Sequence, residues 1–147
     1  MTGFDFLIGD WTVANRRRLN YVDPGSEWEE FTGHSTCRPL FDGGANIEEM
    51  VCPTFTGITL RLFDVEKKEW SLYWSNSKYG VLQPPVVGTF TDGVGEFFGT
   101  DLYADEEIHA RFIWNAITPE SAHWEQAFSQ DGGQTWLTNW TMDFTRR

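Results

Sequence analysis

Apolar and polar side chains alternate along most of this chain with a period of two residues. Near the C-terminus, Trp124 and Phe128 alternate with His123 and Glu125, and residues 136–144 repeat the pattern. Because successive side chains of a β-strand point to opposite faces, this alternation is typical of strands that bury one face. It therefore predicts two β-strands in this part of the chain.

The segment between these two runs, residues 129–136, has the sequence SQDGGQTW. It matches the Asp-box pattern S-x-D-x-G-x-T-W, in which serine and aspartate side chains cap a tight turn and the glycines take positive φ angles. The motif predicts a β-hairpin, in which pairing of Phe128 with Trp136 would place Trp124 opposite Trp140. Carbohydrate handling, suggested by the motif's recurrence in sialidases, is the less favoured interpretation of a single copy.

Eight further strands are expected before this hairpin, each bounded by turn-forming residues. They cover residues 11–22, 26–40, 46–52, 57–65, 69–77, 86–92, 96–103 and 107–117. Residues 78–85 form the one long irregular connection, because their two prolines argue against a strand interior. About ten strands joined in sequence predict an all-β fold, an up-and-down antiparallel β-barrel, since closure removes exposed strand edges. The opening residues, FDFLIGDW, predict a short helical plug across one end.

Length and composition agree with one acidic β domain. The 147 residues fit a single domain, residues 1–147, and 16% of them are aromatic, with eight Trp and twelve Phe. The formal net charge of -11 argues against nucleic acid or an anionic membrane surface as a partner. The chain shows no apolar leader segment and no apolar run of about 18 residues, so we expect a cytoplasmic protein.

The cysteines and histidines give little sign of a metal or cofactor site. Cys37 and Cys52 flank a turn that sets Cys37 opposite residue 48 or 50, so their sulfurs are offset and free thiols are expected. No Cys/His spacing resembles a zinc site, and no P-loop or G-x-S-x-G motif occurs. Haem ligation by a histidine is the less favoured interpretation, because His109 and His123 fall on polar faces. No cofactor and no metal are expected.

Sequence motifs along nearly the whole chain resemble those of a known bacterial family. They are FDFLIGDW, ANRRRLN, EWEEF, CRPLFDGGANIEE, TLRLFD, WSLYWSNS, PPVVGTFTDGVGEF, ARFIWN, HWEQAFSQDGGQTW and NWTMDFTRR. The chain resembles domain-of-unknown-function family 1579, which is similar to the calycin group of lipocalin-like barrels. The resemblance implies a lipocalin-like barrel, and a ligand cavity as a habit of that class. It implies no particular reaction.

The first predicted hairpin carries polar residues on its apolar face. If Val22 pairs with Ser26, then Asn15, Arg17 and Glu29 point inward with the aromatic side chains of this hairpin. A buried Arg17 beside Glu29 could orient a carboxylate or carbonyl group of a ligand. The alternative is a solvated structural ion pair at the mouth of the barrel.

Two further inward-facing polar positions depend on strand register. Glu48 and Met50 are expected to share the face of Cys37, with Glu49 outside. A three-residue connection at residues 66–68 would set Leu60 opposite Trp74, making Leu60 and its alternating neighbours core and leaving Arg61 outside. A four-residue connection would put Arg61 inside. The three-residue connection is the favoured prediction.

Three functional hypotheses from different classes follow. The first is a protein that binds a small apolar ligand in the barrel lumen. The second is an enzyme in which Glu29 or Glu48 serves as a buried general acid or base. The third is a packed barrel that acts through its surface, with no cavity larger than a few waters. A homodimer is also compatible with the aromatic-rich sequence. The candidate ligand-binding residues are Asn15, Arg17, Glu29, Glu48, Trp74, Trp124 and Trp140.

Overall fold

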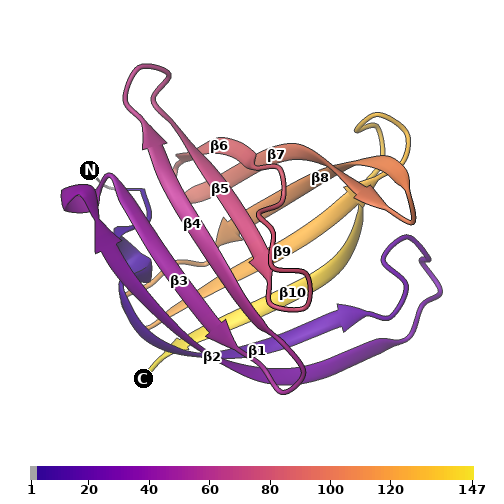
Figure 1. Ribbon diagram of the computed structural model, residues 1–147, viewed down its shortest axis with the longest axis horizontal. Helices are drawn as coiled ribbons and strands as arrows, with labels where there is room; N and C mark the ends of the chain where they lie inside the picture. The colour runs from indigo at the N-terminus through magenta and orange to yellow at the C-terminus, as the bar shows by residue number, and fades with distance from the viewer. Residues whose placement is uncertain (1–2) are drawn as a thin grey trace.

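The computed structural model describes residues 3–147 as a closed antiparallel β-barrel of ten strands (Figure 1). The strands are β1 (Gly9–Arg18), β2 (Trp28–Leu40), β3 (Ala45–Val51), β4 (Thr56–Asp64), β5 (Glu69–Asn76), β6 (Val86–Thr91), β7 (Val94–Tyr103), β8 (Glu106–Asn115), β9 (Ser121–Ser129) and β10 (Leu137–Arg146). Each strand pairs with its neighbours in sequence, and β1 pairs with β10 to close the barrel. The predicted all-β, up-and-down barrel is confirmed.

One end of the barrel is closed by the N-terminal segment around the 3-10 helix η1 (Asp5–Leu7). Phe4 and Leu7 are fully buried there, and we call residues 4–8 the plug and this end the plug end. Arg146 fastens the plug, because its guanidinium donates hydrogen bonds of 2.8 Å to the Ile8 carbonyl and 2.9 Å to the Phe6 carbonyl. The short helical plug predicted from the sequence is present as this single turn. A second 3-10 helix, η2 (Phe41–Gly43), joins β2 to β3 at the same end.

The C-terminal hairpin differs in register from the prediction. Trp124 lies opposite Met142, and Trp140 lies opposite Gln126, so the predicted pairing of Trp124 with Trp140 is wrong. Phe128 pairs with Leu137 and not with Trp136, and an irregularity of the β-bulge type between Thr138 and Trp140 then shifts all later pairs by one more residue. Both tryptophans still point into the barrel, where their ring centroids are 5.6 Å apart at an interplanar angle of 88°.

The turn between β9 and β10 is built by the Asp-box side chains. Asp131 accepts hydrogen bonds from the backbone N–H groups of Gln134 and Thr135 and from the Thr135 hydroxyl. These bonds, led by the one from the Thr135 hydroxyl, hold the pKa of Asp131 well below its usual range. Gly132 and Gly133 take φ angles of 74° and 91°. The loop is therefore held by its own side chains.

The connection between β4 and β5 has four residues, not the predicted three. Asp64 pairs with Glu69, and the Lys68 N–H donates to the Asp64 carbonyl at 2.7 Å, with Lys68 at a φ of 58°. The extra residue sets Arg61 opposite Leu72 on the inward face. The favoured prediction, with Arg61 outside, is wrong, and so are the predicted core positions of Ile58, Leu60 and Leu62. Trp74 and Leu72 do face inward, as predicted.

The first hairpin has shorter strands and a longer loop than expected. β1 ends at Arg18, and residues 19–27 form a loop in which the Ser26 N–H donates to the Asp23 carbonyl. Arg17 therefore lies opposite Glu29, two positions from the register that pairing Val22 with Ser26 would give. A shift by an even number of residues keeps the same side chains inside, so Asn15 is buried as predicted.

Both cysteines are free thiols within the barrel wall, as predicted, and Cys37 lies opposite Glu48. Burial raises the pKa of each thiol to about 11. We expect no reaction of the native protein with a disulfide reagent at pH 8, because the reactive thiolate is scarce there, and two reactive thiols in denaturant without reductant. Fewer than two in denaturant would contradict the assignment.

The same pKa shift predicts a loss of stability in alkali. Because the thiol pKa is higher in the folded state than in the unfolded state, the thiols of the native protein stay protonated to a higher pH. The resulting stabilisation is complete below the ordinary thiol pKa of about 9 and is lost as the pH rises toward about 11. Urea unfolding at pH 8 and pH 10.5 should show this loss, and a Cys37→Ala/Cys52→Ala variant should show a smaller loss.

Candidate functional site

A cavity lies inside the barrel between β3–β5 on one side and β8–β10 on the other. Most of its wall is apolar and comes from Met50, Leu72, Trp74, Trp114, Trp124 and Trp140. The space left between side chains, together with its opening to solvent, totals about 540 Å³. Only about 50 Å³ of it is wide enough for the centre of a water molecule, so the cavity is narrow.

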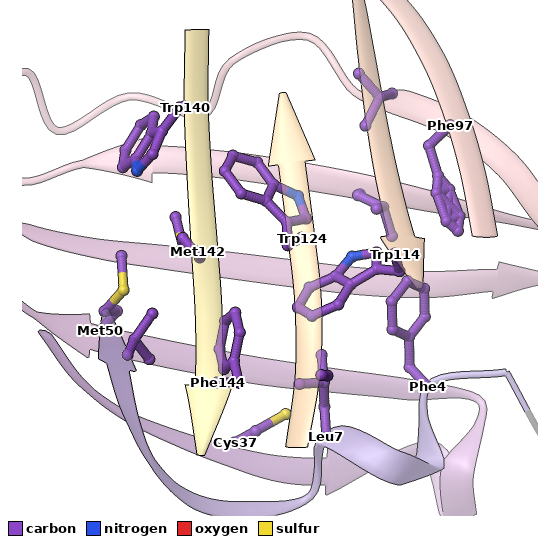
Figure 2. Packing of buried hydrophobic residues seen from close by; sticks show 14 of the residues in the cluster. Phe4, Leu7, Cys37, Met50, Phe97, Trp114, Trp124, Trp140, Met142 and Phe144 are labelled. Carbon is purple, nitrogen blue, oxygen red and sulfur yellow. The ribbon is translucent and has the colours of Figure 1, made fainter. Parts of the chain in front are cut away.

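The apolar wall is continuous with the plug. Figure 2 shows Trp140, Met142 and Phe144 projecting from β10 beside Trp124 and Trp114, with Phe4 rising from the plug below. The Trp114 and Phe144 rings are 5.1 Å apart. Trp74 closes the wall on β5, where its ring lies so close to Gly57 that an added Cβ would be 1.9 Å from it. Only glycine fits beneath this indole.

A charged pair is buried at the polar side of the cavity. Arg61 Nη2 lies 2.5 Å from Glu48 Oε1, and the two side chains are only 3% and 6% exposed. Arg61 Nη1 donates to Asn46 Oδ1 at 3.0 Å, while the Ser35 hydroxyl donates to Glu48 Oε2. The pairing of β3 with β4 produces this cluster, because Asn46 lies opposite Arg61 and Glu48 lies opposite Thr59.

One donor of this cluster has no partner. Arg61 Nε is buried and makes no hydrogen bond within the part of the chain that the structure describes. The Arg61 guanidinium carbon lies 5.0 Å from the ring centroid of Phe4 and 5.8 Å from that of Trp114. Leaving a buried donor unpaired costs free energy. This N–H is therefore suited to donate a hydrogen bond to an acceptor on a molecule in the cavity.

No family model matches the chain, and neither does any curated protein sequence. Among solved structures, the chain is similar to the S-type phycobiliprotein lyase CPES from Guillardia theta. The two share 12% sequence identity with a TM-score of 0.61, over 98% of this chain and 90% of that one. The protein has a lipocalin-like barrel fold. At this identity the likeness concerns the fold alone.

The candidate residues predicted from the sequence fall into two groups in this lipocalin-like barrel. Glu48, Trp74, Trp124 and Trp140 line the cavity. The other three do not line the cavity: Asn15 and Arg17 lie on β1, opposite Met142 and Trp140 of β10, and Glu29 lies on β2, opposite Arg17.

Asn15 is the link between the two groups. It is buried on β1, beside Met142 of β10, and its Oδ1 accepts a 2.9 Å hydrogen bond from Trp140 Nε1. This bond holds the Trp140 indole in place. Because β1 is the neighbour of β10 in the barrel, the first strand lies beside the aromatic face. It does not face Trp124 and Trp140 from across the lumen.

Arg17 and Glu29 form the outer pair of charges. Arg17 Nη2 lies 3.4 Å from Glu29 Oε1, with the side chains 16% and 39% exposed. The Arg17 guanidinium carbon lies 4.9 Å from the centroid of Trp140 and 5.2 Å from that of Phe55. Arg17 is thus half-buried among rings, while its partner reaches solvent.

Three polar lining residues were not among the sequence candidates: Thr59, Arg61 and Gln126. The signal for Arg61 was present, since the four-residue alternative for the β4–β5 connection places it inside. The period-two pattern places Gln126 on the same face as Trp124 and Phe128. Nothing in that pattern identifies a glutamine on this face as a cavity residue. In the structure, Gln126 Nε2 donates to Asn139 Oδ1 at 2.9 Å.

The histidines lie away from the cavity. His34 and His109 are exposed, and His123 Nδ1 lies 2.7 Å from Asp143 Oδ1 on the outer face of β9 and β10. Within residues 3–147, no three residues of the types His, Cys, Asp and Glu are grouped as metal ligands would be. Over the same residues, no helix has the length and apolar character needed to cross a membrane.

Proposed function

We propose that this protein binds a small, largely apolar molecule in the lumen of its barrel. The observation that carries the proposal is the cavity itself, which is lined by four tryptophans and by one buried charged pair whose Arg61 Nε has no partner among the described residues. Ligand sites in proteins are typically concave and apolar, with a few polar groups that fix the orientation of the ligand. Likeness in fold to a phycobiliprotein lyase agrees with this proposal but does not identify a ligand.

The dimensions of the cavity favour a small ligand. A cavity of about 150 Å³ is known to take one benzene ring, and this one offers only about 50 Å³, so even a single-ring ligand requires side chains of the wall to move. Met50 and Met142 also line the cavity, and their flexible side chains allow it to widen for a larger molecule. The ligand body is proposed to lie against Trp74, Trp124 and Trp140.

The two charged pairs are proposed to have different roles. Glu48 and Arg61 lie at the cavity and would hold the polar group of the ligand. Arg17 lies beside Trp140 and its partner Glu29 reaches solvent, so this pair would meet a ligand as it enters from outside. Asn15 is proposed to act through Trp140, by fixing the indole that separates the two pairs.

The narrowness of the cavity agrees with a packed barrel, whereas no observation favours an enzyme. Each oxygen of Glu48 accepts a hydrogen bond, one from Arg61 and one from Ser35, which is the arrangement of a structural ion pair. A barrel acting only through its surface leaves the four tryptophans and the free Arg61 donor without a role. Membership of domain-of-unknown-function family 1579, a cytoplasmic location and a homodimer stay predictions.

A matched pair of variants tests the proposal. Thr59 lines the cavity, whereas the adjacent Ile58 is exposed on the outer face. Thr59→Phe should fill the cavity and weaken binding of α-methylstyrene, a neutral apolar single-ring probe, by at least about tenfold, at a stability cost of about 1 to 3 kcal/mol. Ile58→Phe adds the same ring outside and should leave binding unchanged.

Isothermal titration calorimetry of the wild type and both variants measures this difference. Saturable binding to the wild type and to Ile58→Phe, with loss in Thr59→Phe, is the expected result. Equal heats for all three proteins, or no binding by the wild type, would contradict a ligand site in the lumen and would favour the packed barrel.

A further inference from the structure

The charge of the cavity, and not only its apolar wall, restricts what can bind. Among the described residues that line it, Glu48 and Arg61 are the only charged side chains, and they lie 2.5 Å apart. Their opposite charges cancel within the cavity. A ligand that enters therefore meets no uncompensated charge.

We infer that the cavity selects neutral molecules that carry a hydrogen-bond acceptor, such as a ketone, ester or amide carbonyl next to a small ring, and rejects the corresponding carboxylates. This inference rests on the proposed function, because it names the ligand class of the same site. The observation that supports it is that Arg61 Nε has no partner among the described residues, while the charge of Arg61 is already balanced by Glu48.

The unpartnered donor selects for an acceptor. Arg61 Nη1 donates to Asn46 and Nη2 donates to Glu48, whereas Nε is the guanidinium nitrogen that makes no hydrogen bond within the described residues. A hydrogen bond from a charged donor is stronger than one between neutral groups. A ligand carbonyl that reaches Nε gains this bond, whereas a hydrocarbon of the same shape leaves the donor unpaired.

The completed ion pair selects against a second anion. Glu48 already supplies the one negative charge that Arg61 balances, and Ser35 donates to its remaining oxygen. A bound carboxylate would place a second negative charge in the same buried cluster, without a second cation on the cavity wall. Both desolvation and repulsion from Glu48 oppose this. A barrel with a lone arginine at this position would have the opposite preference.

Three single-ring probes of nearly the same shape separate these effects. Acetophenone has a carbonyl, α-methylstyrene has a carbon–carbon double bond at the same place, and benzoate has a carboxylate. At pH 7 the ketone should bind the wild-type protein about tenfold more tightly than the alkene, because only the ketone accepts from Nε. Benzoate should bind more weakly than either neutral probe.

Variants of Arg61 assign the preference to its Nε. Arg61→Lys keeps a cation beside Glu48 but lacks the Nε–H, so the ketone should lose its advantage over the alkene to within about twofold. Arg61→Met combined with Glu48→Leu gives the same readout if the lysine variant does not fold. Arg17→Lys, the matched change in the outer pair, should leave the preference intact.

The outcomes are distinguishable by calorimetry on the 147-residue chain. Equal affinity for ketone and alkene in the wild type would mean that only water satisfies Arg61 Nε, and it would overturn the inference. Benzoate binding as tightly as the ketone, or more so, would also overturn it while leaving the ligand site in place. If none of the three probes binds, the proposed function itself fails.

Discussion

Replacing Arg61 by methionine is expected to lower the free energy of unfolding by about 3 to 5 kcal/mol, because it leaves the Glu48 carboxylate buried without its cation. The loss is specific to the unbalanced charge and does not come from lost volume, since methionine preserves most of the side-chain packing. The double variant Arg61→Met/Glu48→Leu should recover most of the stability. Urea denaturation with Trp fluorescence as the signal measures both effects.

The outer pair supplies the matched control for this prediction. Glu29 is 39% exposed, so water replaces its partner when Arg17 is changed to methionine. The expected cost of Arg17→Met is about 0 to 1 kcal/mol, in the range of exposed ion pairs. A loss at Arg61 no larger than that at Arg17 would show that Glu48 reaches solvent in the folded protein.

Phe4→Ala is the second substitution for which we expect a large effect. The Phe4 side chain is fully buried, with its ring 5.1 Å from that of Trp70 and 4.9 Å from that of Phe90. Its removal leaves a void at the plug end and should cost about 3 to 5 kcal/mol. Phe41, on the other 3-10 helix of the same end, is 78% exposed, and Phe41→Ala should change stability by no more than about 0.5 kcal/mol.

Thermal or urea unfolding of these two variants compares the same chemical change in two environments. Equal, small effects would mean that the plug is not part of the folded core. The contact between Phe4 and the Arg61 guanidinium gives the experiment a second readout, because loosening the plug should also weaken the ketone preference of the cavity.

The class of fold was predictable from the sequence because period-two alternation recurs in every strand and short turns separate the strands. The same alternation placed Glu48 inside and Glu49 outside, as observed. What it could not supply was the length of each connection, which depends on local backbone hydrogen bonds. Val65 joins residues 66–68 in the β4–β5 connection, where Lys68 takes a left-handed conformation, and this one added residue exchanges the faces of β4.

The candidate site was predictable only in part, for the same physical reason. The tryptophans that line the cavity were identified from the alternation, and three of the four were named as candidates. The buried partner of Glu48 was not, since a one-residue error in a loop moves an arginine from the lumen to solvent. The irregularity between Thr138 and Trp140 shifted a pairing in a similar way, although both tryptophans kept their inward face.

The most direct test of a ligand site in the lumen uses the eight tryptophans as separate reporters. Trp74, Trp114, Trp124 and Trp140 line the cavity, whereas Trp28 and Trp136 lie on the outer face. In ¹H–¹⁵N spectra of the indole N–H groups, titration with acetophenone should shift the four cavity signals in a saturable way and leave Trp28 and Trp136 in place. Shifts confined to Trp28 or Trp136, or no saturable shift of the cavity signals, would contradict binding inside the barrel.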